Sequence, residues 1–338
     1  MLRSHRTLHC LTLLTLLALG CEHDKSVRGA RQDNTNTATT TSPSPAPPTT
    51  PPRASEESLR DNLAVLAREI GERHTGQYES LQRARGWIND ALRGQGFSPT
   101  EQVFTVDNKK VANIVAEIKG EQRPEQIVIL GAHYDTARGT PGADDNGTGV
   151  VALLEIAGAL AKHKPSKTIR FVFFTNEEPP YFQTEEMGSL VYARQCASDE
   201  DEVVAMLSLE MLGYYTDAPD SQHYPPVIGS FYPDEGNFLA FVGNRENSRL
   251  TRRVHRLFEG ASELPSESLS APEWVQGIGF SDQWSFWQVG YPGVMVTDTA
   301  FMRNGHYHEP TDTTDTIDFT RLTAATDGLI DVAVELAK

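Results

Sequence analysis

The run Ile127-Val128-Ile129-Leu130-Gly131-Ala132-His133-Tyr134-Asp135 decides the fold of this chain. Its first four residues are aliphatic and mostly β-branched, which predicts a buried strand. The strand leads into an imidazole and a carboxylate two residues apart. Because residues i and i+2 share one side of an extended chain, Asp135 can hydrogen-bond His133 and hold one tautomer of its ring. A lone His-x-Asp pair is weak evidence of a site, so its meaning depends on the rest of the chain.

Similar apolar runs alternate with helical patterns along the remaining sequence. Further strands are predicted at residues 111–118, 169–174, 203–209, 238–242 and 294–296. Helices are predicted at residues 55–70, 78–95, 148–162, 245–258 and 319–337. This alternation predicts an α/β fold with a central, mostly parallel mixed β-sheet flanked by helices on both faces, in a single domain.

Pairs of acidic residues lie at the start of one of these elements and at the end of another. The turn Pro141-Gly142-Ala143-Asp144-Asp145-Asn146-Gly147-Thr148-Gly149 opens an apolar helix, where acidic residues are ordinarily caps. Glu177 and Glu178 follow the strand at 169–174, and two adjacent buried carboxylates are costly unless a cation compensates them. Adjacent side chains of a strand point to opposite sides, so one of them can bind a metal while the other acts as a base.

The remaining candidates lie further along the chain. Glu210 ends an apolar run in which an acid needs a partner. The segment at 304–312 supplies His306 and His308. In open α/β sheets ligands gather at the carboxyl ends of the strands, and His, Asp and Glu are ligands of zinc. We therefore expect a metal site at this edge of the sheet.

Taken in order, His-x-Asp, Asp-Asp, Glu-Glu, Glu and His resemble the M28 family of co-catalytic zinc peptidases, which includes bacterial aminopeptidases. The resemblance covers the body of the chain, residues 56–338. It implies two zinc ions per chain, bridged by one aspartate and bound by a set of five residues: His133, Asp145, Glu178, Glu210 and His308. It also implies that Glu177 is the general base and that Asp135 is the partner of His133. Only the resemblance selects Asp145 over Asp144, and His308, through a His-x-x-x-Asp pattern completed by Asp312, over His306.

The activity implied by the resemblance is hydrolysis of peptide bonds, with an aminopeptidase that releases N-terminal residues as the main hypothesis. One alternative is a glutaminyl cyclase, an acyltransferase that uses a single zinc on the same fold. A second alternative is a non-catalytic, peptide-binding lipoprotein. The sequence leaves open which side chain is preferred, and it does not distinguish zinc from cobalt or manganese.

Three features depart from the family pattern or extend it. Glu210 stands where many members have Asp, and Gln283 stands where a His is usual. The segment at 179–186 lengthens the loop after the Glu-Glu pair, and we expect it to shape the rim of the site. Its Glu185-Glu186 pair is not expected to bind metal. Five aromatic residues can line a pocket, but core packing is the expected role of each: Tyr214, Tyr215, Tyr232, Trp284 and Trp287.

The N-terminus predicts export. Residues 1–20 combine basic residues with a short apolar stretch, as in a secretory signal peptide. Ala18-Leu19-Gly20-Cys21 resembles the bacterial lipobox, which predicts a lipid anchor at Cys21 as the chain's only link to a membrane. Residues 21–55 are rich in Thr, Ser and Pro and predict a disordered tether. These signals indicate a lipoprotein of the bacterial cell envelope, or a secreted protein.

The charge of the chain indicates its class of partner, and its cysteine content indicates the role of Cys196. The chain has 30 basic and 46 acidic residues and a formal charge of −16, without a basic cluster in the body, so nucleic acid is not an expected partner. A peptide or protein substrate is expected instead. Cys196 is the one cysteine of the body, and its helical surroundings at 190–197 predict a small core residue.

Overall fold

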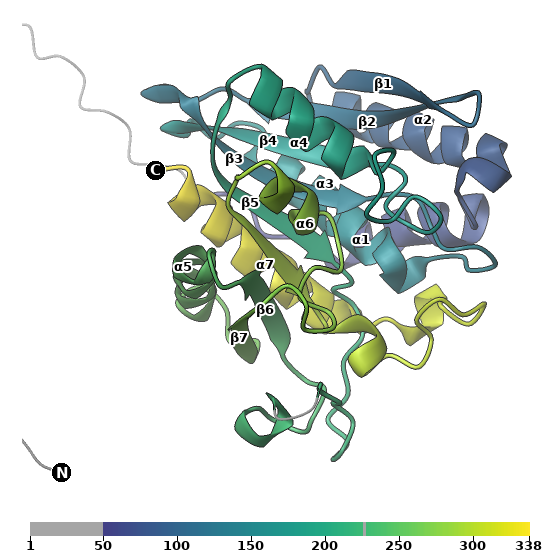
Figure 1. Cartoon of the computed structure of the whole chain (residues 1–338), viewed down its shortest axis with the longest axis vertical. Coiled ribbons are helices and arrows are strands. Elements are labelled where there is room, and N and C mark those ends of the chain that lie inside the picture. Colours follow the sequence, from purple (N-terminus) through teal and green to yellow (C-terminus); the bar gives the residue numbers. More distant parts are fainter. Residues whose placement is uncertain (1–49, 226–227) are drawn as a thin grey trace, which may run out of the picture. The chain divides into compact units, whose positions relative to one another are not determined.

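A computed structural model describes residues 50–225 and 228–338 (Figure 1). The predicted signal peptide at 1–20, the lipid anchor at Cys21 and the predicted tether as far as residue 49 lie outside the described residues. Residues 50 onward belong to one compact unit. Among the described residues, the helices are too short or too polar to cross a bilayer.

An eight-stranded mixed sheet forms the centre of this unit (Figure 1). Its spatial order is β1-β2-β4-β3-β5-β8-β6-β7. The strands β4, β3, β5 and β8 pair in parallel, whereas β2 and β6 run antiparallel to their neighbours β4 and β8. The bounds are β1 Thr100–Val106, β2 Lys109–Ile118, β3 Arg123–His133, β4 Lys167–Phe174, β5 Glu202–Glu210, β6 Leu239–Asn244, β7 Ser266–Ala271 and β8 Gly293–Thr297. The predicted α/β class with a mostly parallel mixed sheet is confirmed.

Helices cover both faces of the sheet. One face carries α1 (Glu56–Leu63), α2 (Tyr78–Gly94), α3 (Gly149–Leu160), α5 (Ser248–Glu259) and α7 (Phe319–Leu336). The other carries α4 (Gly188–Ser198) and α6 (Gln283–Gln288), which lie in front of the sheet in Figure 1. Single turns of 3-10 helix lie at Thr75–Gln77, Ile228–Phe231, Ala300–Met302 and Thr314–Thr316, and π-helical turns at Ala64–Ile70 and Ala143–Thr148.

The two faces of the central strands bury separate apolar layers, as alternating side chains require. In β3, Val128 and Leu130 pack into the layer under α3 and α7, whereas Ile127 and Ile129 pack towards α4 and α6. Cys196 of α4 is 2% exposed within the second layer, which confirms its prediction as a core residue.

Two strands and one helix were not predicted. The strands β1 and β7 form the two edges of the sheet, where one side pairs with nothing and polar residues are tolerated. The sequence of β7, Ser-Glu-Ser-Leu-Ser-Ala, contains too few apolar residues to show a period of two. The helix α6 has only six residues, fewer than a helical period needs to be recognised.

The sheet places the predicted site residues at the carboxyl ends of its central strands. Because β3, β5 and β8 are parallel, their carboxyl ends lie side by side. His133 is the last residue of β3 and Glu210 the last residue of β5. The loop that follows β4 carries Glu177 and Glu178 to the same edge.

Candidate metal centre

Two triads of potential metal ligands meet at Asp145. The first consists of His133, Asp145 and Glu210, and the second of Asp145, Glu178 and His308, with the ligand atoms of each within 4.8 Å of one another. The histidines approach different oxygens of the shared carboxylate: Nε2 of His133 lies 3.4 Å from Oδ1 of Asp145, and Nε2 of His308 lies 3.1 Å from Oδ2. The structure thus brings together all five residues that the sequence analysis assigned to metal binding.

Polar atoms left without partners indicate what these triads can hold. Both ring nitrogens of His133, Nε2 of His308 and Oε1 of Glu178 are buried and make no hydrogen bond. Buried polar atoms are normally paired, and an unpaired group costs about 1–3 kcal/mol. Imidazole nitrogens and carboxylate oxygens in sets of three are the donors that zinc takes in catalytic sites. The donor set therefore fits two zinc ions that share Asp145.

The acidic groups of the centre destabilise one another when no cation lies between them. Burial raises the pKa of Glu178 to about 7, with the charge of Asp145 acting in the same direction. Burial opposes the charged form of His308, but the adjacent carboxylates of Asp145 and Glu178 outweigh it and raise its pKa to about 10. Burial also opposes the charged form of His133, but the charges of Glu210 and Glu177 outweigh it and raise the pKa of His133. The site therefore attracts positive charge, which protons or metal ions can supply.

Backbone contacts hold the turn that carries Asp145. The carboxylate of Asp312 accepts the N–H groups of Asp144 at 2.8 Å and Asp145 at 3.1 Å. Asn146 donates to the carbonyl of Leu209 at 2.8 Å and accepts the N–H of Met211 at 3.0 Å. The turn is thereby fixed to the end of β5, beside Glu210.

Arg73 holds the same turn through its backbone carbonyls, a role that was not predicted. Its side chain is fully buried, and its guanidinium donates to the carbonyls of Tyr134 at 2.7 Å, Pro141 at 2.7 Å and Gly142 at 2.9 Å. Burial lowers its pKa to about 10, although the charges of Asp312 and Asp135 oppose that shift. The residue stands in no recognisable motif, so only the folded chain reveals this role.

Asp135 organises the loop after β4 and faces the ring of His133. Its Oδ1 lies 3.6 Å from Nδ1 of His133, longer than a hydrogen bond, so the structure does not contain the hydrogen bond that was predicted between these side chains. Its two oxygens accept the N–H groups of Glu177 at 3.1 Å and Glu178 at 3.2 Å. Glu177 itself belongs to neither triad, and its Oε2 lies 3.9 Å from Nε2 of His133. Burial raises the pKa of Glu177, with His133 opposing and Glu178 and Glu210 adding to the shift.

The residues that the sequence analysis set aside have other contacts. Asp144 accepts the hydroxyl of Thr148 at 3.0 Å and the N–H of Gly213 at 2.9 Å. His306 pairs its Nδ1 with the hydroxyl of Thr311 at 2.8 Å. Glu185 forms an ion pair with Arg194. Asp144, His306 and Glu185 therefore belong to neither triad.

The segment before α6 supports the centre in a way that was not predicted. Ser281 donates its hydroxyl to Oε2 of Glu210 at 2.6 Å. Gln283 is buried and donates to the carbonyl of Ile278 at 3.1 Å. Gln283 thus holds Ile278 in the wall of the adjoining pocket and does not line that pocket itself.

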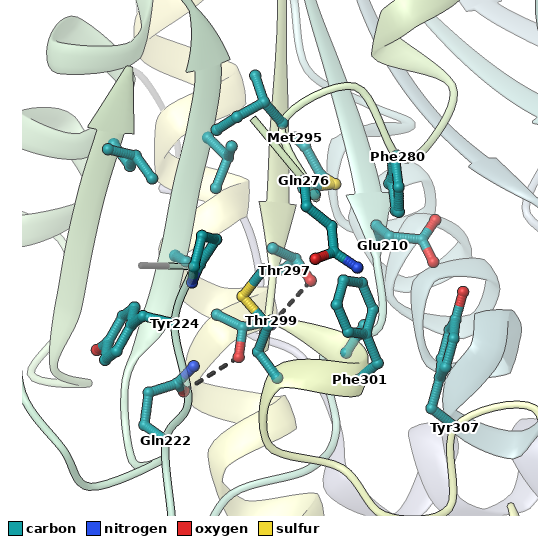
Figure 2. Close-up of a pocket in the computed structure, with 18 of the residues that line it drawn as sticks. Glu210, Gln222, Tyr224, Gln276, Phe280, Met295, Thr297, Thr299, Phe301 and Tyr307 are labelled. Carbon is teal, nitrogen blue, oxygen red and sulfur yellow. Dashed lines mark hydrogen bonds between the residues drawn. The ribbon is translucent and has the colours of Figure 1, made fainter. Parts of the chain in front are cut away.

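A pocket of about 270 Å³ opens onto both triads and runs towards β6 and β7 (Figure 2). In Figure 2, Glu210 and Tyr307 lie on one side of it and Tyr224 on the other, with Phe301 between them. Phe182 and Pro179 of the lengthened loop line it, as expected for a segment that shapes the rim. Tyr232 also lines it, which was the alternative to the core packing expected for this residue.

Comparison with known proteins identifies relatives across most of the chain. It is 38% identical over 292 residues to Uncharacterized protein YfbL of Escherichia coli (strain K12), covering 84% of this chain and 89% of that protein. It is 26% identical over 240 residues to Leucine aminopeptidase 1 of Blastomyces gilchristii (strain SLH14081), covering 67% of this chain but only 56% of that protein.

Solved structures share the fold at low sequence identity. The zinc aminopeptidase BSAP from Bacillus subtilis superposes with a TM-score of 0.68 at 16% identity, covering 86% of this chain and 96% of that one. A glutaminyl cyclase from Bacteroides thetaiotaomicron superposes with a TM-score of 0.65 at 17% identity, covering 84% and 99%. These likenesses establish the zinc aminopeptidase-like fold. Residues 113–333 match the sequence profile of Peptidase family M28, and the chain belongs to that family.

Proposed function

We propose that this chain is a di-zinc aminopeptidase that releases N-terminal residues from peptides. The observation that carries the proposal is the pair of triads sharing Asp145, whose histidines approach opposite oxygens of one carboxylate. Membership of peptidase family M28 supports peptide-bond hydrolysis. His133 and Glu210 complete the first zinc site in this proposal, and Glu178 and His308 the second.

The two triads would hold the zinc ions, which would supply a water molecule of lowered pKa and polarise the scissile carbonyl when bound. Glu177 is the proposed general base, which takes a proton from the attacking water and delivers it to the leaving amine. Its carboxylate lies beside the first triad without belonging to it. Asp135 is a positioning residue, because it fixes the backbone of Glu177 and Glu178 through their N–H groups.

The pocket offers space for the side chain of a residue next to the scissile bond. It lies directly beside Glu177, Glu178 and Glu210 and is lined on its far side mainly by aromatic and aliphatic side chains. A side chain next to the scissile bond can enter such a cavity and orient the carbonyl. In this proposal the side chain belongs to the N-terminal residue of the peptide.

The test combines metal analysis with two activity assays on the same purified protein. We expect about two zinc ions per chain and hydrolysis of a panel of aminoacyl anilides that stops on chelation and returns with zinc. Glu177→Gln should keep its zinc and lose about 10²–10⁴-fold in kcat. Glu185→Gln is the matched control, because Glu185 pairs with Arg194 away from the triads. Activity that survives chelation or Glu177→Gln would sink the proposal.

The second assay decides between the proposal and its alternatives. Turnover of a Gln-peptide to its cyclic product without anilide hydrolysis would identify a glutaminyl cyclase, whose fold this chain shares. A protein that purifies without metal and is inert on both substrates would support the non-catalytic, peptide-binding lipoprotein.

We further propose that the chain is exported and anchored by lipid at Cys21, on the evidence of the sequence at 1–21 alone. Incorporation of labelled palmitate, lost in Cys21→Ser, tests the anchor. A wild-type chain that takes up no label but reaches the medium would be secreted without an anchor.

A further inference from the structure

One row of residues crosses four neighbouring strands and has a carboxylate at each end. The register pairs Glu210 of β5 with Thr297 of β8, Thr297 with Ala240 of β6, and Ala240 with Glu267 of β7. Residues directly opposite one another on paired strands point to the same face. Glu267 therefore faces the same side as the metal centre, three strand spacings or about 14 Å from Glu210 measured between Cα positions.

The space between these carboxylates is the pocket. All four residues of the row line it, and Ala240 and Thr297 are small enough to leave the floor open. The next row on this face is apolar, with Val242 of β6 opposite both Met295 of β8 and Leu269 of β7. The cavity is thus an apolar slot with the metal centre at one end and Glu267 at the other.

Aromatic residues cover the far end of the slot without pairing with Glu267. Tyr224 and Tyr232 stack on each other with ring centroids 5.9 Å apart. Their hydroxyls donate elsewhere, that of Tyr232 to the carbonyl of Ser268 at 2.9 Å and that of Tyr224 to the carbonyl of Pro233.

Glu267 is itself without a cationic partner in contact within the described part of the chain. Burial raises its pKa, the charge of His255 on α5 opposes this, and Glu259 adds to it. His255 directs its Nε2 to the hydroxyl of Ser266 at 3.1 Å, and its Nδ1 lies 3.8 Å from Glu259. A half-buried carboxylate in an aromatic cavity gains most from a cation that arrives through the slot.

We propose that Glu267 is a specificity-determining residue that selects substrates with an N-terminal lysine or arginine. These side chains combine an aliphatic stem, which suits the apolar slot, with a cation at its end, which suits Glu267. The inference rests on the proposed function, because it places the reacting peptide bond at the metal centre. Leucine also fits the apolar part of the slot but leaves Glu267 without a partner.

Kinetics on the zinc-loaded full chain test the selection. Norleucine is the neutral counterpart of lysine, so the substrates are Lys-, Arg-, norleucine- and Leu-aminomethylcoumarin. We expect kcat/KM for Lys to exceed that for norleucine by about tenfold or more, and Glu267→Gln to remove this preference. The control is Glu246→Gln, which makes the same charge change at an exposed position beyond the opposite end of β6 and should keep the preference. A Lys-to-norleucine ratio near one in the wild type, or an unchanged ratio in Glu267→Gln, overturns the inference.

Binding measured without turnover separates this inference from the proposed function. Calorimetric titration with lysinamide and norleucinamide should show tighter binding of lysinamide to the wild type but not to Glu267→Gln. If this difference appears while every substrate resists hydrolysis, the proposed function fails and the role of Glu267 stands. If Leu substrates are hydrolysed but lysinamide binds no better than norleucinamide, the role of Glu267 fails and the proposed function stands.

Discussion

Replacing Asp135 by Asn tests whether one carboxylate organises both halves of the site. Its oxygens accept the N–H groups of Glu177 and Glu178, and it faces the ring of His133. Asn keeps the shape but offers one acceptor, so one of these two buried N–H groups loses its partner. The loss of one hydrogen bond to a charged group corresponds to about 1.5–3 kcal/mol. The loss of the charge beside His133 should weaken zinc binding by about 10–100-fold.

The assay measures zinc affinity by competition with a chelator, and then kcat/KM at saturating zinc. We expect both to fall in Asp135→Asn, with kcat/KM reduced even when zinc is saturating, because the backbone of Glu177 loses its anchor. Asp90→Asn is the control, since Asp90 is exposed and pairs only with Arg93 at the surface. A variant with wild-type zinc affinity and wild-type turnover would refute the reasoning.

Three further predictions concern the support of the site and the packing around it. Ser281→Ala removes the 2.6 Å hydrogen bond to Glu210 and should weaken zinc binding about tenfold in the same competition assay; an unchanged affinity would contradict it. The pKa of His308 is about 10 and that of Glu178 about 7 without metal, so zinc must displace protons at neutral pH and its affinity should rise with pH. Calorimetry in two buffers of different ionisation enthalpy measures that release, and equal heats would argue against it. Gly188→Ala places a methyl group against the carbonyl of Thr175 and should lower the free energy of unfolding by about 1–3 kcal/mol, whereas Gly86→Ala in α2 meets open space and should not; equal denaturation midpoints for the two variants would count against this.

The interior of the sheet could be predicted from the sequence because both faces of its central strands are buried. The run at 127–130 within β3 is continuously apolar, and the runs at 169–174 in β4 and 203–209 in β5 are interrupted only by Arg170 and Ser208. The edge strands β1 and β7 were not predicted, because few of their residues are buried and their sequences therefore need few apolar residues. Their places follow from pairing with β2 and β6, which no local pattern encodes.

The candidate ligands were visible for a related reason. An acid or imidazole that ends an apolar run, as Glu210 does, is conspicuous in sequence. Arg73 and Ser281 were not, because their importance lies in tertiary contacts with the turn at 141–145 and with Glu210. Glu267 lies in a polar strand, where a single glutamate gives no signal until the sheet register places it in the pocket.

The segment after β8 contributes two separate elements of the centre. His308 supplies the nitrogen of the second triad, and Asp312 holds the backbone of Asp144 and Asp145. A chain still growing on the ribosome has neither until the segment after β8 is made, even when β3, β4 and β5 are already synthesised. The second triad is therefore completed only after residue 308 has been synthesised, and a chain truncated before that residue has no second triad.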